Sequence, residues 1–535
     1  MKNKFLLGIL VGSTMMTASV AYADTATTSN KWGSHIDLEG KAGTDRNLGE
    51  TDLFIPLLQN DDTLFFTNMR ARMDDQSSRE GNFGFGLRHM LESGWNLGGI
   101  AYFDRRETEW GNYFNQVTLG VEALSTDWDF RANAYLPQGR RSHEVDALNE
   151  ATITGTSVMF TAGEERSMSG FDAEIGWRLP VYEPEGPKQF RLFAGGYRFT
   201  GDNVDDITGP RLRGELAFDE VPWLWEGSRF SFGTEWQHDD PRGSQGFVTA
   251  RLRIPLQIFG GTSSRSLTPM ERRMTDPVIR DIDVVSQAGA FGATEVATET
   301  ADGEALTVLD SASTTTVADL NTALTNAGST TVILSGTFST NAAVQVAAGQ
   351  TLVGGGTMTV KSPSGKTATL LVPGATIAAQ DTATSSTVVM ADNSTLRNMT
   401  VTNYRNGAGN AYAVNLQNKT GVTIENSTIT SYGNSGTGFG IDAYNSTNAV
   451  IRGNTVTASS SAANAIGMRA QDATNITIAD NSISLPTAGA VKYVLQGNNG
   501  TSFNATSTGN TASSGTCNFF TPPTGSVGFG SINCP

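Results

Sequence analysis

The sequence predicts an all-β protein: a 12-stranded antiparallel outer-membrane β-barrel followed by a parallel β-helix. The first observation is that segments between Ser34 and Leu256 alternate apolar and polar side chains, as strands between lipid and a barrel lumen do. The second is that aliphatic residues recur every 27 or 28 positions between Leu396 and Ile483, as they do in a stacked solenoid. The third is an N-terminal export signal, which directs a chain out of the cytoplasm.

The N-terminus has the parts of a secretory signal peptide. Lys2 and Lys4 supply positive charge, an apolar run follows from Phe5 to Val11, and an Ala-Tyr-Ala cleavage motif ends at position 23. We therefore expect a signal peptide over residues 1–23 and a short periplasmic segment over residues 24–33. Export also means that cysteines in the mature chain meet an oxidising compartment.

Composition excludes several classes of partner. The formal net charge is -16, from 37 basic and 53 acidic residues, which argues against nucleic acid. The four histidines are scattered without metal-ligand spacing, so we expect no metal site and no cofactor. The partner expected from the barrel pattern is outer-membrane lipid.

Residues 34–256 fit the barrel as twelve strands. One strand alternates Phe171 and Ile175, which suit lipid, with Asp172 and Glu174, which suit a water-filled lumen. The predicted strands are residues 34–43, 49–58, 63–73, 81–91, 95–105, 113–124, 128–137, 170–181, 188–199, 209–219, 228–238 and 245–256. An even number leaves both barrel ends in the periplasm, so the longest connection, 138–169, should be extracellular. A soluble β-sandwich is the alternative, but it does not explain charges on one face of nearly every strand.

Six motifs in this region carry a family resemblance: Gly84-Phe85-Gly86-Leu87-Arg88-His89, Gly94-Trp95-Asn96-Leu97-Gly98-Gly99, Ala101-Tyr102-Phe103-Asp104, Leu119-Gly120-Val121-Glu122-Ala123, Ala132-Asn133-Ala134-Tyr135-Leu136-Pro137 and Gly170-Phe171-Asp172-Ala173-Glu174. They resemble the translocator barrel of inverse autotransporters, the intimin and invasin family. The resemblance covers most of residues 32–256. It implies a pore that carries its own C-terminal passenger to the cell surface, where the passenger stays attached. It also implies barrel-assembly and periplasmic chaperone machinery as partners.

Residues 257–302 are predicted to be a linker threaded through the pore. Crossing a bilayer of roughly 40 Å takes only about 13 extended residues, so the linker is long enough. Thr268-Pro269-Met270-Glu271 has the form of a capping box with proline at the first helical position, which predicts a short helix from Pro269 to about Met274. A disordered tether is the alternative. The expected contacts join linker arginines to lumen carboxylates: Arg272, Arg273 and Arg280 with Glu174, Glu215 and Glu235.

The rest of the chain contains repeats that predict a solenoid over residues 303–515. Three columns advance by 27 or 28 residues per coil: Leu396, Ile424, Ile451 and Ile478; Val401, Ile429, Val456 and Ile483; and Val414, Ile441 and Met468. Asn, Gly and Asp stand at matching places between them, where a chain turns a corner. The pattern resembles pectate-lyase-like solenoids, which implies a right-handed parallel β-helix. Residues 516–535 should form a C-terminal cap, in which Cys517 and Cys534 are expected to form a disulfide.

The solenoid could be a binding surface or an enzyme. A polysaccharide lyase would need a carboxylate cluster for calcium and a basic residue for proton removal. The exposed positions after two of the columns carry instead charged or polar residues that can pair between adjacent coils: Arg397, Asn415, Glu425, Asp442, Arg452 and Arg469. We therefore expect no enzyme but an adhesin that displays its passenger at the cell surface and binds a surface receptor or glycan. A lyase-like surface enzyme and a passive outer-membrane channel are the alternatives.

Overall fold

The computed structural model describes residues 31–219, 221, 224–256, 267–281, 283–486, 491–498 and 500–534. The predicted signal peptide, residues 24–30 of the predicted periplasmic segment and residues 257–266 of the predicted linker lie outside these described residues. The chain divides into two compact units. The barrel unit comprises residues 1–139, 169–200 and 205–284, and the solenoid unit comprises residues 140–168, 201–204 and 285–535. None of the helices in the described ranges is both long enough and apolar enough to cross a membrane.

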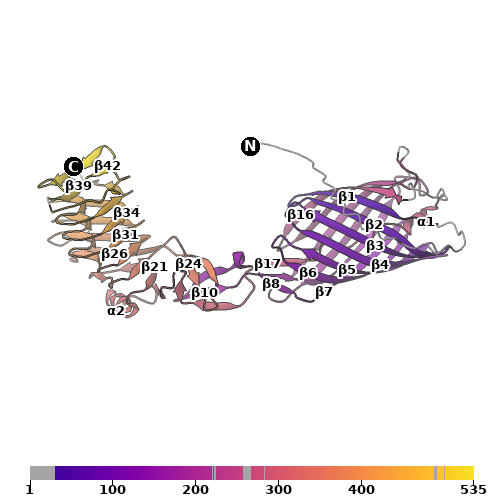
Figure 1. Ribbon diagram of the computed structural model, residues 1–535, viewed down its shortest axis with the longest axis horizontal. Helices are drawn as coiled ribbons and strands as arrows, with labels where there is room; N and C mark the ends of the chain where they lie inside the picture. Colours follow the sequence, from indigo (N-terminus) through magenta and orange to yellow (C-terminus); the bar gives the residue numbers. More distant parts are fainter. Residues whose placement is uncertain are drawn as a thin grey trace. The chain divides into compact units, whose positions relative to one another are not determined.

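The barrel unit is a closed antiparallel barrel of twelve strands (Figure 1). They are β1 (His35–Gly43), β2 (Leu48–Gln59), β3 (Thr63–Asp74), β4 (Arg79–Leu91), β5 (Trp95–Glu107), β6 (Tyr113–Ser125), β7 (Trp128–Gln138), β12 (Ser169–Leu179), β13 (Lys188–Thr200), β14 (Ile207–Asp219), β15 (Arg229–Asp239) and β16 (Gly243–Pro255). β1 closes the barrel by pairing with β16, with His35 opposite Pro255. The prediction of twelve strands is confirmed, and every strand end lies within two residues of its predicted place.

Side chains along these strands alternate between the outer face and the lumen, as predicted. On β12, Phe171 is 57% exposed on the outer face, whereas Asp172 and Glu174 are buried in the lumen. The polar side chains of the lumen form charge pairs between strands. Arg253 on β16, for example, donates hydrogen bonds of 2.9 and 3.0 Å to the two carboxylate oxygens of Asp37 on β1. Opposite charges on adjacent strands neutralise each other, which allows them to pack without bulk water.

Two glycines of β4 make room for aromatic rings inside the barrel. A Cβ atom on Gly84 would lie 2.4 Å from the ring of Tyr102, and one on Gly86 would lie 2.2 Å from the ring of Phe66. Any larger residue would therefore displace a ring. These rings belong to an apolar cluster in the lumen, which consists of Trp32, Phe54, Leu64, Phe66, Tyr102, Met274 and Val278.

The linker forms the short helix that its sequence predicts. Helix α1 (Pro269–Arg273) begins after Thr268, whose side chain accepts a hydrogen bond from the backbone N–H of Glu271. The Glu271 carboxylate accepts one from the backbone N–H of Thr268 at 2.7 Å, which completes the capping box. The helix ends at Arg273 with Met274 as its C-cap, within one residue of the end expected from the proline at position 277.

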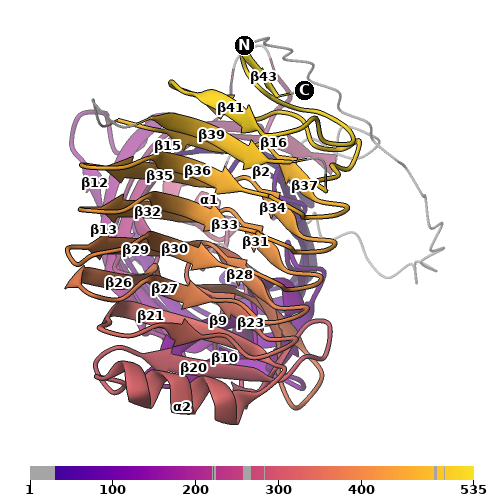
Figure 2. The ribbon, with the colours of Figure 1, turned by 90° about the vertical axis from the view of Figure 1, so that its left-hand side faces the viewer.

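The solenoid unit is a parallel β-solenoid of stacked coils (Figure 2). Helix α2 (Val317–Ala327) lies at one end of the stack, with β20 (Leu306–Asp310) and β21 (Thr331–Ser339) beside it. The first sheet contains β23 (Thr351–Val353), β28 (Thr395–Arg397), β31 (Thr423–Glu425), β34 (Val450–Arg452) and β37 (Thr477–Ala479). The second contains β26 (Ala375–Thr382), β29 (Met399–Arg405), β32 (Thr428–Gly433), β35 (Thr455–Ser460), β38 (Ser482–Ser484) and β40 (Thr511–Ala512). The third contains β22 (Val344–Gln345), β27 (Ser386–Val389), β30 (Ala411–Asn415), β33 (Gly438–Asp442), β36 (Ala465–Arg469), β39 (Lys492–Gly497) and β41 (Thr516–Phe519).

The three predicted columns stack in register inside the solenoid. Ile424 pairs with Ile451, which pairs with Ile478, and all three are buried in one core cluster. Val401 and Ile429 are partners in the second column, and the third column also lies in that core. The repeat of 27 residues therefore corresponds to one coil, and the prediction of a parallel solenoid is confirmed.

Corners between the first and second sheets need residues that accept a left-handed backbone. Asn398, Asn426, Gly453 and Asp480 occupy equivalent corners with φ between +52° and +67°. Gly and Asn accept this conformation more readily than other residues. Buried amides support the same corner, because Asn454 Nδ2 donates to Asn481 Oδ1 at 3.0 Å and Asn481 Nδ2 donates to Asn510 Oδ1 at 2.9 Å.

The structure differs from the sequence prediction in two segments. Both are predicted to be connecting segments without strands, and both contain strands. The predicted extracellular connection forms β8 (Ser142–Glu144), a 3₁₀ turn (Asp146–Leu148), β9 (Glu150–Thr154), β10 (Ser157–Thr161) and β11 (Glu164–Ser167). The end of the predicted linker forms β17 (Ser286–Gly289), β18 (Thr294–Ala297) and β19 (Glu299–Thr300). With β24 (Thr357–Lys361) and β25 (Thr367–Leu371) these strands make two small sheets, and β42 (Val527–Phe529) and β43 (Ile532–Cys534) form a C-terminal hairpin. We call residues 140–168 the barrel loop, because they connect barrel strands β7 and β12.

Candidate functional site

The barrel lumen is filled by a plug, which we define as residues 267–281, 283 and 284. Two plug arginines reach carboxylates on the barrel wall. Arg280 Nη1 lies 2.6 Å from Asp104 Oδ1 on β5, and Arg273 Nη2 lies 2.7 Å from Asp129 Oδ1 on β7. All four side chains are buried. Removing one partner of such a pair leaves an uncompensated charge, so these pairs fix the position of the plug.

Arginines of the barrel wall also bind oxygen atoms of the plug. Arg229 on β15 lies 2.7 Å from the carboxylate of Asp276. Arg88 on β4 donates to two plug carbonyl oxygens, those of Met274 at 2.9 Å and Asp276 at 2.7 Å. Arg72 on β3 lies 3.2 Å from Asp283. The plug is therefore bound through its backbone as well as its side chains.

The predicted partners of the plug arginines are wrong in detail. Glu174 pairs with Arg213 and Arg131 of the wall, Glu215 lies 3.7 Å from Arg229, and Glu235 lies 3.4 Å from Lys41. Arg272 donates to the carbonyl oxygen of Leu267 within the linker. The three glutamates already pair with basic residues of the barrel wall, so they are not free to pair with the plug arginines. Asp104 and Asp129 stand at lumen-facing positions of alternating strands, and this alternation was the signal that could have identified them.

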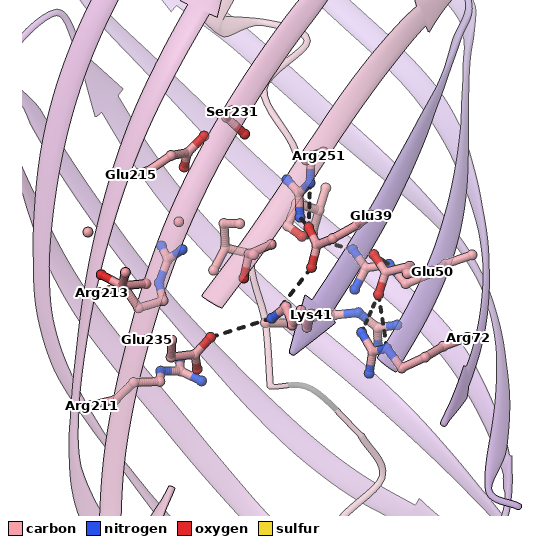
Figure 3. A pocket seen from close by; sticks show the side chains of 18 residues that line it. Glu39, Lys41, Glu50, Arg72, Arg211, Arg213, Glu215, Ser231, Glu235 and Arg251 are labelled. Atoms are coloured by element: carbon pink, nitrogen blue, oxygen red, sulfur yellow. Dashed lines mark hydrogen bonds and ion pairs between the residues drawn. The ribbon is translucent and has the colours of Figure 1, made fainter. Parts of the chain in front are cut away.

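A small cavity lies in the lumen beside the plug (Figure 3). A cavity of about 60 Å³ lies between the plug and the wall strands β1, β2, β3, β14, β15 and β16. Glu39, Lys41, Glu235 and Arg251 point into it and bind one another. A volume of this size holds a few water molecules. The plugged barrel is therefore closed along this part of the lumen.

The six charged or polar residues predicted on the solenoid surface divide between two of its sheets. Arg397, Glu425 and Arg452 follow one another on the first sheet, where Arg452 Nη2 lies 2.6 Å from Glu425 Oε2. Asn415, Asp442 and Arg469 follow one another on the third sheet. The first set is an ion-pair ladder in which Glu425 lies between two arginines, whereas the second set contains one ion pair, between Asp442 and Arg469.

The ion pair on the third sheet lies beside aromatic rings that are not among the predicted surface residues. Tyr412 and Phe439 are partners on adjacent coils, with ring centroids 4.8 Å apart and an angle of 15° between the rings. The guanidinium carbon of Arg469 lies 4.8 Å from the Phe439 ring and 5.1 Å from the ring of Tyr444, which is 37% exposed. We call Tyr412, Phe439, Asp442, Tyr444 and Arg469 the aromatic–arginine patch. The 27-residue repeat places Tyr412 and Phe439 in register, so this signal was present in the sequence.

Asp442 holds the arginine of this patch in one orientation. Arg469 Nε lies 2.7 Å from Asp442 Oδ1 and Nη2 lies 2.5 Å from Oδ2, a two-bonded pair in which Asp442 is fully buried. Partial burial lowers the pKa of Arg469, but the hydrogen bonds and charge of Asp442 outweigh it and hold the pKa above its ordinary value. Gln417 donates a further hydrogen bond to Asp442. The patch therefore holds Arg469 in one orientation beside aromatic rings, of which Phe439 is buried and Tyr444 is exposed.

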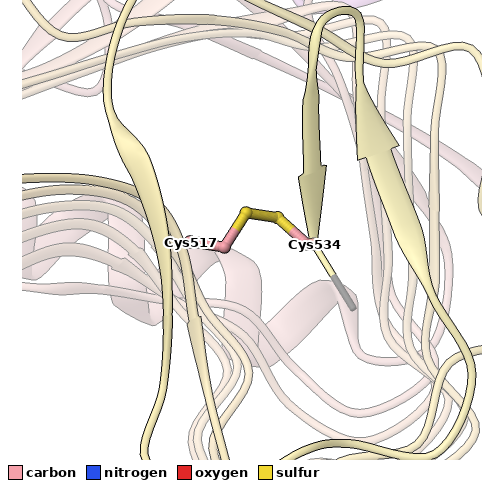
Figure 4. The surroundings of a disulfide bond; sticks show 2 residues. All are labelled: Cys517 and Cys534. Atoms are coloured by element: carbon pink, nitrogen blue, oxygen red, sulfur yellow. A yellow bond between two sulfur atoms is a disulfide. The ribbon is translucent and has the colours of Figure 1, made fainter.

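A disulfide joins Cys517 on β41 to Cys534 on β43 (Figure 4). The two Cα atoms are 5.5 Å apart. The bond connects the last strand of the third sheet to the C-terminal hairpin, whose Val527 and Phe529 are buried in the solenoid core. It therefore ties the end of the chain over the last coil.

Comparisons with known families agree with this architecture. Residues 15–213 match the family described as "Inverse autotransporter, beta-domain", and residues 316–519 match the family "Protein of unknown function (DUF1565)". The barrel is an inverse autotransporter beta-domain of the outer membrane, and the β-solenoid is the passenger on the outer side. No curated protein matches the chain.

Solved barrels have a low similarity to the chain. A chain from work on the in-meso crystallisation of membrane proteins has 17% identity and a TM-score of 0.36, covering 48% of this chain and 99% of that one. The translocator domain of the autotransporter NalP from Neisseria meningitidis has 9% identity and a TM-score of 0.24, covering 43% and 90%. Outer membrane phospholipase A from Escherichia coli has 10% identity and a TM-score of 0.26, covering 44% and 94%.

Proposed function

We propose that this protein is an adhesin whose passenger binds uncharged glycans through the aromatic–arginine patch. The observation that supports this is the combination of stacked rings with a fixed arginine at one place on the third sheet. Sugars have apolar C–H faces that pack on aromatic rings and hydroxyl groups that need hydrogen-bond partners. Tyr444 and Arg469 supply both on one surface.

Charge favours a neutral ligand over an acidic polymer. The chain carries a formal net charge of -16, which repels polyanions at a distance. Within the patch, Asp442 cancels the charge of Arg469. The nearby Asn415 adds an amide, which donates to Ser386 Oγ at 3.2 Å. A hydroxyl-rich, uncharged ligand suits these groups.

We propose binding rather than catalysis for the solenoid surface. Lyase chemistry needs carboxylates that are free to hold calcium. The two carboxylates predicted on this surface, Glu425 and Asp442, each accept two hydrogen bonds from a single arginine on the next coil. Such pairing occupies both carboxylate oxygens of Asp442 and Oε2 of Glu425, which a cation would otherwise use.

The barrel and plug serve export and anchoring in this proposal. The wall contacts of Arg273 and Arg280 keep the finished pore closed, which argues against a passive channel. An intimin- or invasin-like route, with barrel-assembly and periplasmic chaperone machinery as partners, is part of the same proposal.

The test is glycan binding by cells that display the full-length protein. Tyr444→Ala and Arg469→Gln should each weaken binding to a neutral-glycan array by about tenfold or more, because both remove central contacts. Phe520→Ala is the matched control, since Phe520 is an exposed aromatic residue outside the patch. Wild-type binding by both patch variants would refute the glycan site. Cleavage of the glycan, seen as release of fragments, would refute the choice of binding over catalysis.

A further inference from the structure

The barrel loop does not stand alone, because strands of the passenger, which we define here as the residues from Val285 onward, complete its sheets. β10 pairs with β18 from Val158 opposite Ala297 to Thr161 opposite Thr294, and β11 pairs with β17 over four positions. On its other side, β9 contacts β25 at Ala151 and Leu370. The order of the larger sheet is β18-β10-β9-β25-β24-β19. Two strands from the barrel loop therefore lie in the middle of a sheet that otherwise belongs to the passenger.

The barrel loop also buries apolar side chains of the first coils. Phe160, 1% exposed, and Val158 lie in one cluster with Val308, Ile333 and Val353. β9 and β10 lie beside β20 and β21 at the α2 end of the stack (Figure 2). The remaining members of this cluster are Ala151, Ala162, Ala297, Val360, Ala368, Leu370 and Val372.

The outward-facing column of the first sheet changes from apolar to charged residues where the cover by the barrel loop ends. In register, the column begins with Val308, Ile333 and Val353. It continues on the following coils with Arg397, Glu425 and Arg452, which form the ion-pair ladder. Apolar residues at outward positions need cover from water. The sequence of the passenger is thus adapted to the barrel loop at its first coils and to solvent beyond them.

The barrel loop precedes the passenger in the sequence, so it is available to fold before the passenger does. Its hairpin turns at Gly155, with φ of +60° in a two-residue connection, which favours local formation of β9 and β10. The loop is part of the translocator sequence, whereas the passenger begins only after the plug. Met168 N–H donates to the carbonyl oxygen of Val285, the first passenger residue in the solenoid unit, at 2.9 Å. The first segment past the plug therefore meets the edge of β11 at once.

We propose that the barrel loop is a surface template on which the first passenger strands fold by strand addition. A solenoid coil is stabilised by its neighbours, so the first coil is the costly one. Free edges of β10 and β11 provide backbone hydrogen bonds for β18 and β17, and Val158 and Phe160 provide an apolar face. Later coils then add to the completed first coil. The barrel thus exports the passenger and also starts its folding.

The test uses the full-length protein in cells, with an epitope tag after Gly497. Barrel folding is followed by heat-dependent gel migration, and passenger folding by protease resistance on intact cells. Phe160→Asp should leave barrel migration unchanged and remove the resistant passenger from the surface, lowering the protease concentration needed for digestion by at least about tenfold. Thr152→Asp, on the exposed face of the same hairpin, should behave as wild type. Wild-type resistance in Phe160→Asp, or loss of barrel migration, would overturn the proposal.

A second pair of variants separates a template from a passive cover. Phe160→Ala should slow the appearance of protease resistance in a pulse-chase experiment, because a template acts before the folding transition state. Phe529→Ala removes a fully buried ring at the other end of the solenoid and should lower final resistance without slowing its appearance. An unchanged rate in Phe160→Ala, or equal slowing by both variants, would overturn the template role.

Discussion

Ile451→Ala tests the solenoid core at its centre. Ile451 is buried, with Ile424 and Ile478 as its partners on the two adjacent coils. The substitution removes three carbon atoms from the core. At about 0.8 kcal/mol per buried methylene this is about 2.4 kcal/mol, and the residual cavity brings the loss to about 3–4 kcal/mol. The loss spreads to neighbouring coils because each coil is stabilised by the next.

The free energy of unfolding of the passenger is measured by pulse proteolysis of the purified full-length protein across a urea series. Barrel migration on gels serves as an internal reference, since Ile451 lies in the solenoid unit. Val491→Ala is the matched control, because Val491 is 52% exposed and its truncation should change stability by less than about 0.5 kcal/mol. Equal effects of the two substitutions would show that the 27-residue columns do not share a core, and would refute the reasoning.

Three further predictions concern the barrel, the plug and the C-terminal cap. Ile175 is 51% exposed at a lipid-facing position, and Ile175→Arg should lower the free energy of unfolding by about 2–4 kcal/mol if the residue lies near the bilayer midplane. The measurement is urea unfolding in lipid vesicles, and a loss near zero would mean that the faces of β12 are assigned wrongly. Arg280→Met should leave the Asp104 carboxylate without its ion-pair partner in the lumen and raise single-channel conductance in planar bilayers. The control is Arg198→Met at an exposed ion pair, and unchanged conductance in Arg280→Met would contradict the closing role of the plug. Cys517→Ser should lower the free energy of unfolding of the passenger by about 3 kcal/mol, because the disulfide closes a loop with a sequence separation of 17. The C-terminal hairpin of β42 and β43 should become sensitive to protease first, and wild-type resistance of this hairpin would contradict the prediction.

The sequence predicts the barrel and the solenoid because both folds impose a strict period on side chains. Alternation over two residues identifies all twelve barrel strands, and the 27-residue columns identify which positions are buried together. The capping box at Thr268 identifies helix α1 from four consecutive residues. In each case the decisive interactions are local or repeat at a fixed spacing.

The partners of the plug and the fold of the barrel loop could not be predicted in the same way. Arg280 has several lumen carboxylates within reach, and the choice of Asp104 depends on which of them wall arginines already neutralise. Phe160 and Ile333 lie in one buried cluster, although they are far apart in sequence and no repeat relates them. Such pairings are fixed by packing across the fold and leave no periodic signal.

The central claim is that one chain anchors itself in the outer membrane and displays its own passenger. The most direct measurement is antibody access on intact cells to a tag placed either after Gly497, in the solenoid, or within residues 60–62, in the short connection between β2 and β3. The account predicts that the solenoid tag is accessible and the connection tag is accessible only after the outer membrane is permeabilised. Equal protection of both tags, or access to the connection tag alone, would contradict it.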